Sequence, residues 1–225
     1  QAVETAIKQY AVEAIVLDDG FQHRRLARDL DIVLIDALEP FGFDYLFPRG
    51  TLREPLTSLR RADTVALTRV DRISAERRAE LKNRIQSIAP RAVWIELAYH
   101  AAFLTDCEGN TVSLATLRDA SVFGFCGIGN PENFGRTLTG EPWRVQQCEE
   151  YPDHHHYTQA DSEELSKRAA NCGATAVLCT HKDLVKIRSL WKSSIPLYAV
   201  MLETEIRAGE AALASLLGKL TDASR

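Results

Sequence analysis

Two adjacent carboxylates, Asp18 and Asp19, follow directly after an apolar run at residues 14–17. The run predicts a buried parallel strand, and ligands of open α/β sheets bind beyond the carboxyl ends of such strands. Acidic side chains in that place can hold Mg²⁺ on the phosphates of a nucleotide, and a solvated turn is the alternative. Residues 21–25 add an amide, an imidazole and two guanidinium groups, which favours a polyphosphate site over a plain turn.

A loop rich in arginine spans residues 48–55, with Arg49 and Arg53 inside it and Arg60 and Arg61 just beyond it. The planar guanidinium group matches the oxygens of a phosphate in pairs. The loop therefore has the chemistry to hold a phosphorylated substrate. A solvated basic loop is the alternative that composition leaves open.

The densest cluster of titratable side chains lies at residues 153–157, where Asp153 precedes three consecutive histidines. An imidazole exchanges its proton near neutral pH, so one of these histidines could act as a general base that Asp153 orients. Imidazole also suits Zn²⁺, but three consecutive side chains do not easily converge on one ion in regular structure. General-base chemistry is therefore the favoured interpretation, and an exposed polar turn is the second alternative.

Two further turns carry polar groups at the ends of expected strands. Gly127 and Gly129 open a strand-to-helix turn whose backbone N–H groups could face an anion, although the full dinucleotide fingerprint is absent. A purely structural turn is an equally good interpretation of this glycine pair. Thr180, Lys182 and Asp183 form a similar turn, in which Lys182 either reaches a substrate or caps a helix.

Short apolar runs alternate with amphipathic stretches along the chain, a pattern typical of an α/β fold with parallel strands. Besides 14–17, the runs predict strands or extended segments at residues 31–36, 64–68, 92–97, 101–104, 122–126, 176–180 and 196–200. The amphipathic stretches predict helices at residues 3–10, 74–88, 132–139, 162–170, 182–191 and 208–220.

A hairpin marks the expected domain boundary. The extended segments that begin at residue 92 are expected to turn at residues 106–110 and to return at 112–114. We predict a first domain over residues 1–97 and a second α/β domain, which includes the hairpin, over residues 98–225.

The composition limits the class of protein. Of the 225 residues, 45% are hydrophobic and 26% are charged, which is ordinary for a globular protein and excludes disorder as the dominant state. The formal net charge of −4 leaves no overall basic surface for nucleic acid, so no nucleic-acid partner is expected. No apolar run reaches the ~18 residues of a membrane span. Five cysteines without a C-x-x-C pair fit a reducing cytosol.

Taken in order, five motifs resemble those of the tetraacyldisaccharide 4'-kinase family, the kinases of lipid A biosynthesis. They are Asp18 to His23 with Arg25 to Asp29, Pro48 to Pro55, Gly127 to Pro131 with Phe134, Tyr151 to His155 with Tyr157, and Thr180 with Lys182, Asp183 and Lys186. The match extends over essentially the whole chain, and the order of the motifs makes it more specific than any one of them.

The resemblance implies transfer of the γ-phosphate of ATP to the 4'-hydroxyl of an acylated glucosamine disaccharide 1-phosphate, which gives lipid IVA. It implies ATP and Mg²⁺ as cofactors, and work at the cytoplasmic face of the bacterial inner membrane with peripheral membrane contact. The implied fold has two α/β/α domains, the first of the P-loop NTPase type. A two-stranded linker joins them, and the hairpin at residues 92–114 would be that linker.

The resemblance also implies a role for each matching residue. The roles fall into three groups: residues that hold Mg²⁺-ATP, residues that activate the sugar hydroxyl, and residues near the phosphorylated substrate. In that order they are Asp18 and Asp19 with Gln22 and His23 in support, His154 with Asp153, and Arg49, Arg53 and Lys182.

The sequence departs from the family in a respect that affects its chemistry. No G-x-x-x-x-G-K-[ST] run, the P-loop that cradles the β- and γ-phosphates, occurs in residues 1–225. We therefore expect the chain to be the C-terminal part of such a kinase, without its anchor helix and P-loop, and to have no useful activity alone. Two other functions stay open: a non-catalytic module that binds the lipid disaccharide and, with less support, a metal-dependent hydrolase.

Overall fold

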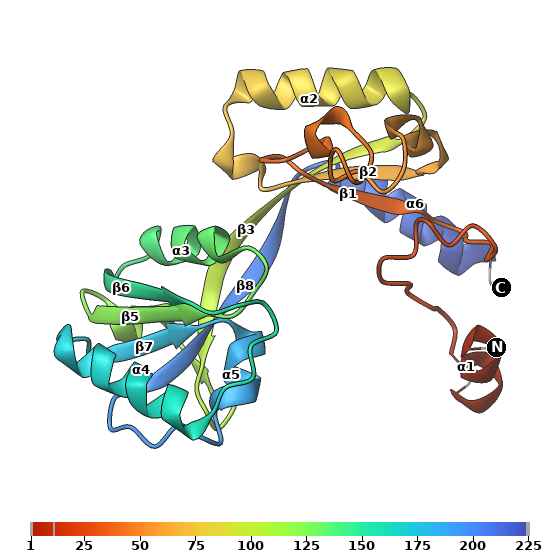
Figure 1. Cartoon of the computed structure of the whole chain (residues 1–225). Helices are drawn as coiled ribbons and strands as arrows, with labels where there is room; N and C mark the ends of the chain where they lie inside the picture. Colours follow the sequence, from red (N-terminus) through yellow and green to blue (C-terminus); the bar gives the residue numbers. More distant parts are fainter. Residues whose placement is uncertain (1, 11, 224–225) are drawn as a thin grey trace. The chain divides into compact units, whose positions relative to one another are not determined.

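The structure is a computed structural model that describes residues 2–10 and 12–223 (Figure 1). The chain forms two compact units. The first comprises Gln1–Ala98 together with Ile206–Arg225, and the second comprises Tyr99–Glu205. The division into domains 1–97 and 98–225 stays a prediction; the two units differ from it in that residues 206–225 group with the first.

The described residues form eight strands that pair in the order β1-β2-β3-β8-β7-β5-β6, with β4 against β3. The strands are β1 (Ile32–Asp36), β2 (Thr64–Thr68), β3 (Val93–Thr105), β4 (Thr111–Val112), β5 (Ser121–Cys126), β6 (Arg144–Glu150), β7 (Ala176–Cys179) and β8 (Leu197–Ala208). The pairs β1–β2, β2–β3, β5–β6, β5–β7 and β7–β8 are parallel, whereas β3 and β4 are antiparallel. The expected α/β fold with a largely parallel sheet is confirmed.

Helices connect most of these strands. The α-helices are α1 (Ala2–Tyr10), α2 (Ala75–Ile88), α3 (Pro131–Thr139), α4 (Gln159–Asn171), α5 (His181–Ile187) and α6 (Glu210–Ala223). Short 3₁₀ helices are η1 (Gly42–Asp44), η2 (Leu56–Arg61), η3 (Val70–Arg72) and η4 (Leu114–Leu117). All six predicted helices are confirmed, although the one expected at 182–191 ends at Ile187. None of the helices in the described part of the chain is long and apolar enough to cross a bilayer.

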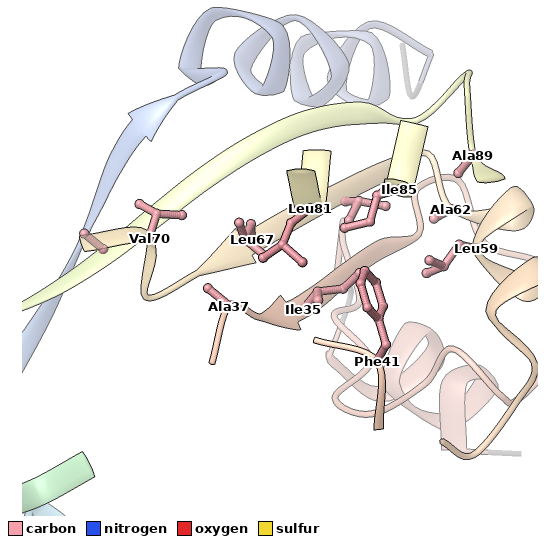
Figure 2. Close-up of a cluster of buried hydrophobic side chains, with 12 residues drawn as sticks. Ile35, Ala37, Phe41, Leu59, Ala62, Leu67, Val70, Leu81, Ile85 and Ala89 are labelled. Carbon is pink, nitrogen blue, oxygen red and sulfur yellow. The ribbon is translucent and has the colours of Figure 1, made fainter. Parts of the chain in front are cut away.

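The core of the first unit lies between the sheet and α2. All five residues of β2 are buried, and Leu81 and Ile85 of α2 are each only 1% exposed. These two residues are four apart and therefore lie on one face of the helix, where Leu81 lies beside Leu67 of β2 (Figure 2). The helix begins after Ser74, whose Oγ accepts a hydrogen bond from the N–H of Arg77 at 3.2 Å.

The strand predicted at residues 14–17 is wrong. These residues lie in no strand, and Val16 is 94% exposed. A strand needs a neighbour that satisfies its backbone N–H and C=O groups, and no described segment pairs with 14–17. β1 likewise pairs only with β2 among the described strands, so its Ile32 and Leu34 are 44% and 61% exposed.

The strands β3 and β8 each continue from one unit into the other, because both unit boundaries fall inside them. β3 joins into one strand the two extended segments predicted at 92–97 and 101–104. The predicted hairpin is confirmed, since Leu104 pairs with Val112, but its second arm stays within the second unit. The two passages between the units are therefore β3 and β8 rather than the two arms of the hairpin.

The second unit buries the strands at its centre between two layers of helices (Figure 1). Successive side chains of a strand point to opposite faces. Phe123 and Phe125 of β5 pack in one cluster with residues of α4 and α5, and Val122 and Cys126 pack in another with residues of α3. Because both faces are covered, β5 and β7 are continuous apolar runs rather than alternating ones.

Leu81→Ala should lower the free energy of unfolding by about 2–5 kcal/mol, because it opens a cavity where α2 packs on β2. A urea titration followed by the amide NMR signals of β2 measures this loss. Gln86→Ala, at an exposed position of the same helix, is the matched control and should change the free energy by less than about 0.5 kcal/mol. Equal stability of Leu81→Ala and the unaltered chain would contradict this packing.

Candidate functional site

The site residues predicted from the sequence divide between the two units, and each group is described by itself. The first unit carries Asp18, Asp19, Gln22, His23, Arg49 and Arg53, and the second carries Asp153, His154 and Lys182. All of them are exposed. Within residues 2–10 and 12–223, no three His, Cys, Asp or Glu side chains gather in a way that could hold a metal ion by themselves.

Asp19 connects the acidic motif to the arginine-rich loop of the first unit. Its backbone is left-handed, with φ of 52°, a conformation that Asp adopts more readily than most residues. Its carboxylate forms an ion pair with Arg53, and the hydrogen bond from Arg53 to Asp19 raises the pKa of that guanidinium. The structure thus pairs a residue expected at the metal with one expected at the substrate.

Arg61 makes a second connection between the same two segments. Its guanidinium lies over the ring of Phe21, 4.4 Å from the ring centroid, and donates to the backbone oxygen of Phe21 at 3.4 Å. It also donates to Oε2 of Glu54 at 2.7 Å, and this hydrogen bond lowers the pKa of Glu54 below its usual value. Arg61 therefore holds the segment after the acidic pair against the arginine-rich loop.

Arg28 fixes the other end of the acidic motif. Its Nε donates to Oδ1 of Asp31 at 2.6 Å, and one terminal nitrogen donates to the backbone oxygen of His23 at 2.7 Å. Asp31 immediately precedes β1. A loop without regular structure is thereby tied to the start of the sheet, close in sequence to the exposed side chains of Gln22 and His23.

The chemistry of the acidic pair fits Mg²⁺ bound together with a nucleotide. Mg²⁺ prefers oxygen ligands, and it is usually held by one or two carboxylates together with the phosphates of the substrate. Asp18 and Asp19 supply two exposed carboxylates in one turn. In this structure Asp19 is already in an ion pair with Arg53, so Asp18 is the carboxylate better placed to bind a cation.

The histidine cluster of the second unit lies in the loop at residues 151–157, which we call the His loop. His154 has a left-handed backbone, with φ of 61°, and its N–H donates to Oδ1 of Asp153 at 2.9 Å. The imidazole Nε2 of His154 lies 3.8 Å from Oδ2 of Asp153, which is longer than a hydrogen bond. Asp153 therefore stabilises the backbone turn in which His154 is exposed at the tip of the loop.

The three consecutive histidines do not point to one place. His155 is half-buried between two tyrosines, with its ring centroid 4.5 Å from that of Tyr151 and 4.8 Å from that of Tyr157. Its Nε2 lies 3.4 Å from Oδ2 of Asp161, whereas its two neighbours His154 and His156 are exposed. The middle histidine thus anchors the loop, and its neighbours face solvent.

The glycine turn at residues 127–130, which we call the Gly loop, packs against the His loop. A Cβ at Gly127 would lie 3.0 Å from Oη of Tyr157, and a Cβ at Gly129 would lie 3.2 Å from Oδ2 of Asp153. Both are closer than ordinary van der Waals contact, so a larger residue at either position would require the neighbouring side chain to shift by a few tenths of an ångström. The Gly loop ends at Asn130, whose side chain caps α3.

The turn at residues 180–183 divides its residues between solvent and core. Lys182 is exposed in the first turn of α5, whereas Asp183 is completely buried. Thr180 caps the helix by accepting a hydrogen bond from the N–H of Asp183. Sequence reasoning assigned Lys182 to substrate and left Asp183 without a role.

Several residues that hold these segments together were missed by sequence reasoning. They are Arg28 and Arg61 on the first unit and His155, Tyr157 and Asp183 on the second. Each lies inside or next to a motif. For Asp183 the available signal was an acidic residue in the first turn of the helix that follows an apolar strand, a place where its carboxylate accepts hydrogen bonds from backbone N–H groups.

Comparison with known proteins identifies the family to which the chain is similar. The sequence profile of the family described as LpxK, tetraacyldisaccharide-1-P 4'-kinase, matches residues 1–221. A tetraacyldisaccharide 4'-kinase of Halothermothrix orenii is 34% identical over 97% of this chain and 61% of its own length. One of Anaeromyxobacter sp. strain K is 38% identical over 83% of this chain and 50% of its own.

A solved structure shares the fold. The crystal structure described as the apo form of LpxK from Aquifex aeolicus in complex with ATP has a TM-score of 0.69 and 26% identity, over 96% of this chain and 60% of that one. The chain spans between 50% and 61% of the length of these three proteins. The resemblance found in the five motifs is therefore confirmed at the level of the family.

Glu54→Gln should make the free energy of unfolding of the first unit less dependent on pH in the acid range. The bond from Arg61 holds the pKa of Glu54 below its unfolded value of 4.5, so this contribution is present at neutral pH and is lost as the pH falls through the lower, folded pKa. Urea midpoints of β2 amide signals, compared at neutral pH and about pH 3, measure the difference. The control is Glu13→Gln, at an exposed position; an unchanged pH dependence in Glu54→Gln would refute this contribution.

Proposed function

The chain belongs to the tetraacyldisaccharide-1-P 4'-kinase family, and we propose that it is part of an enzyme that phosphorylates a tetraacyldisaccharide 1-phosphate at its 4'-hydroxyl with ATP. The observation that carries this proposal is the family match over residues 1–221, which includes all five ordered motifs. The product is lipid IVA, an intermediate of lipid A.

The acidic turn of the first unit is the proposed nucleotide side. Asp18 and Asp19 would hold Mg²⁺, which when bound neutralises charge on the β- and γ-phosphates. Gln22 and His23 are exposed just beyond this turn and would donate hydrogen bonds to the same phosphates. The solved Aquifex protein described as a complex with ATP supports a nucleotide as the ligand.

His154 is the proposed general base. Its imidazole would take the proton of the 4'-hydroxyl while the hydroxyl oxygen bonds to the γ-phosphorus, and the bond from that phosphorus to the β–γ bridging oxygen breaks so that ADP leaves. Exposure at the tip of the His loop supports this role, because a base must reach the proton that it removes. Asp153 would keep the turn in place through the N–H of His154.

The arginine-rich loop is the proposed site for the phosphorylated end of the disaccharide. Arg49 stacks on Tyr45 with its guanidinium carbon 3.5 Å from the ring centroid, which orients its donors. Arg53 can exchange Asp19 for a phosphate at little cost, because the pair is exposed and such pairs contribute little to stability. Lys182 is a further exposed cation that we propose to contact the phosphorylated substrate.

We further propose that the enzyme meets its acylated substrate at the cytoplasmic face of the bacterial inner membrane by peripheral contact. ATP is a cytoplasmic metabolite and the substrate carries acyl chains, so the reaction needs a protein that reaches a membrane surface from the cytoplasm.

His154→Ala, in the full-length protein that contains this chain, should lower kcat for ATP-dependent phosphorylation of the disaccharide by roughly 10²–10⁴-fold. The KM for ATP should stay unchanged, because His154 acts on the hydroxyl. Thin-layer separation of the ³²P-labelled lipid measures the rate. His100→Ala, an exposed histidine of the same unit, is the control and should retain full turnover.

Lipid binding without ATP-dependent turnover in the unaltered full-length protein would instead support the non-catalytic lipid-binding module. A separate expectation concerns residues 1–225 alone. Because they contain no P-loop run, we expect no turnover of ATP from this segment by itself, and product formation by it would refute the need for a P-loop.

A further inference from the structure

Asp183 is the most completely buried acidic side chain of the second unit, at 0% exposure. A buried carboxylate is costly unless hydrogen-bond donors compensate it. Three donors do so, and each comes from a different segment: the N–H of Gly127 at 3.1 Å, the hydroxyl of Tyr157 at 3.0 Å and the hydroxyl of Thr180 at 2.6 Å.

These donors mark the ends of neighbouring parallel strands. Gly127 follows β5, Thr180 follows β7, and the His loop follows β6. Asp183 therefore lies beneath the edge of the sheet at which α/β proteins bind their ligands. Its own contacts are all with protein, and none of its surface reaches solvent.

Tyr157 connects Asp183 to the His loop. Its ring packs edge-on against Phe125, with centroids 5.5 Å apart, and against His155 on the loop itself. Burial and the charge of Asp183 raise the pKa of Tyr157, so the hydroxyl stays a donor. Lys186, one turn further along α5, donates to the backbone oxygen of His155 at 3.3 Å.

We propose that Asp183 is a positioning residue, which fixes the His loop against the Gly loop and so sets where His154 stands. Its effect on turnover rests on the proposed function, whereas its effect on the two loops does not. A left-handed residue such as His154 persists only where its surroundings hold it. The two anchors that follow it in the His loop, His155 and Tyr157, are held by Lys186 and Asp183 of α5.

The central test is Asp183→Asn in the full-length protein. The amide keeps the size of the side chain but has one acceptor oxygen for three donors, and its NH₂ faces another donor. We expect kcat to fall by about 10–100-fold with KM for ATP within about 2-fold, because misplacement of His154 affects the chemical step rather than nucleotide binding. Asp119→Asn, an exposed position in the same unit, should leave both constants unchanged.

Hydrogen exchange gives a readout that does not depend on the reaction. In Asp183→Asn, peptides that cover the Gly loop and the His loop should exchange about 10-fold faster or more, while peptides of β7 keep their protection. If the unaltered protein lacks kinase activity, the proposed function fails and the exchange comparison still decides the role of Asp183.

Smaller changes keep the proposal testable if Asp183→Asn does not fold. Tyr157→Phe removes one donor and should lower kcat by about 3–10-fold with faster exchange of the His loop. Thr180→Val should act in the same direction, and Thr180→Ser, which restores the hydroxyl, should recover turnover. Unchanged kcat and loop exchange in Asp183→Asn or Tyr157→Phe, or a raised KM for ATP with unchanged kcat, would overturn the proposal.

Discussion

The second unit is organised around one carboxylate that has no access to water. Because Asp183 must be compensated by hydrogen bonds, the chain brings Gly127, Tyr157 and Thr180 to it from three strand ends. That requirement explains features which look independent in the sequence. A Cβ at position 127 would lie only 3.0 Å from the Tyr157 hydroxyl oxygen, which favours glycine there. Thr180 caps α5 by accepting a hydrogen bond from the N–H of Asp183, the residue whose carboxylate accepts the loop contacts.

The first unit holds its loops with three arginines, of which Arg28 and Arg61 are part-buried and Arg53 is exposed. Arg28, Arg53 and Arg61 each bridge the segment around the acidic pair to another part of the unit. The pair of Arg53 with Asp19 is exposed, and such pairs contribute little stability and exchange partners readily. This contact can rearrange around a charged ligand, whereas the His loop is held by a buried group.

Much of the fold could be predicted from the sequence, because continuous apolar runs such as 64–68 and 122–126 are typical of strands covered on both faces. The same reasoning failed at 14–17, since an apolar run specifies a strand only where a neighbour can pair with it. The motifs of the candidate site could be recognised in the sequence, and their roles stay predictions. The hydrogen bond from Gly127 to Asp183 could not be predicted, because fifty-six positions separate the two residues. Composition does not indicate which donors will bond to a buried carboxylate.

The passage of β3 and β8 between the units makes the first unit discontinuous in sequence, since residues 99–205 are inserted into it. During synthesis the second unit therefore leaves the ribosome whole while the first still lacks its last segment, Ile206–Arg225. Domains generally fold as units as they emerge, so the Gly loop and the His loop of the second unit can form first. The segment Ile206–Arg225 joins the first unit later, so the order of translation separates the folding of the unit that carries the acidic turn from that of the unit that carries the His loop.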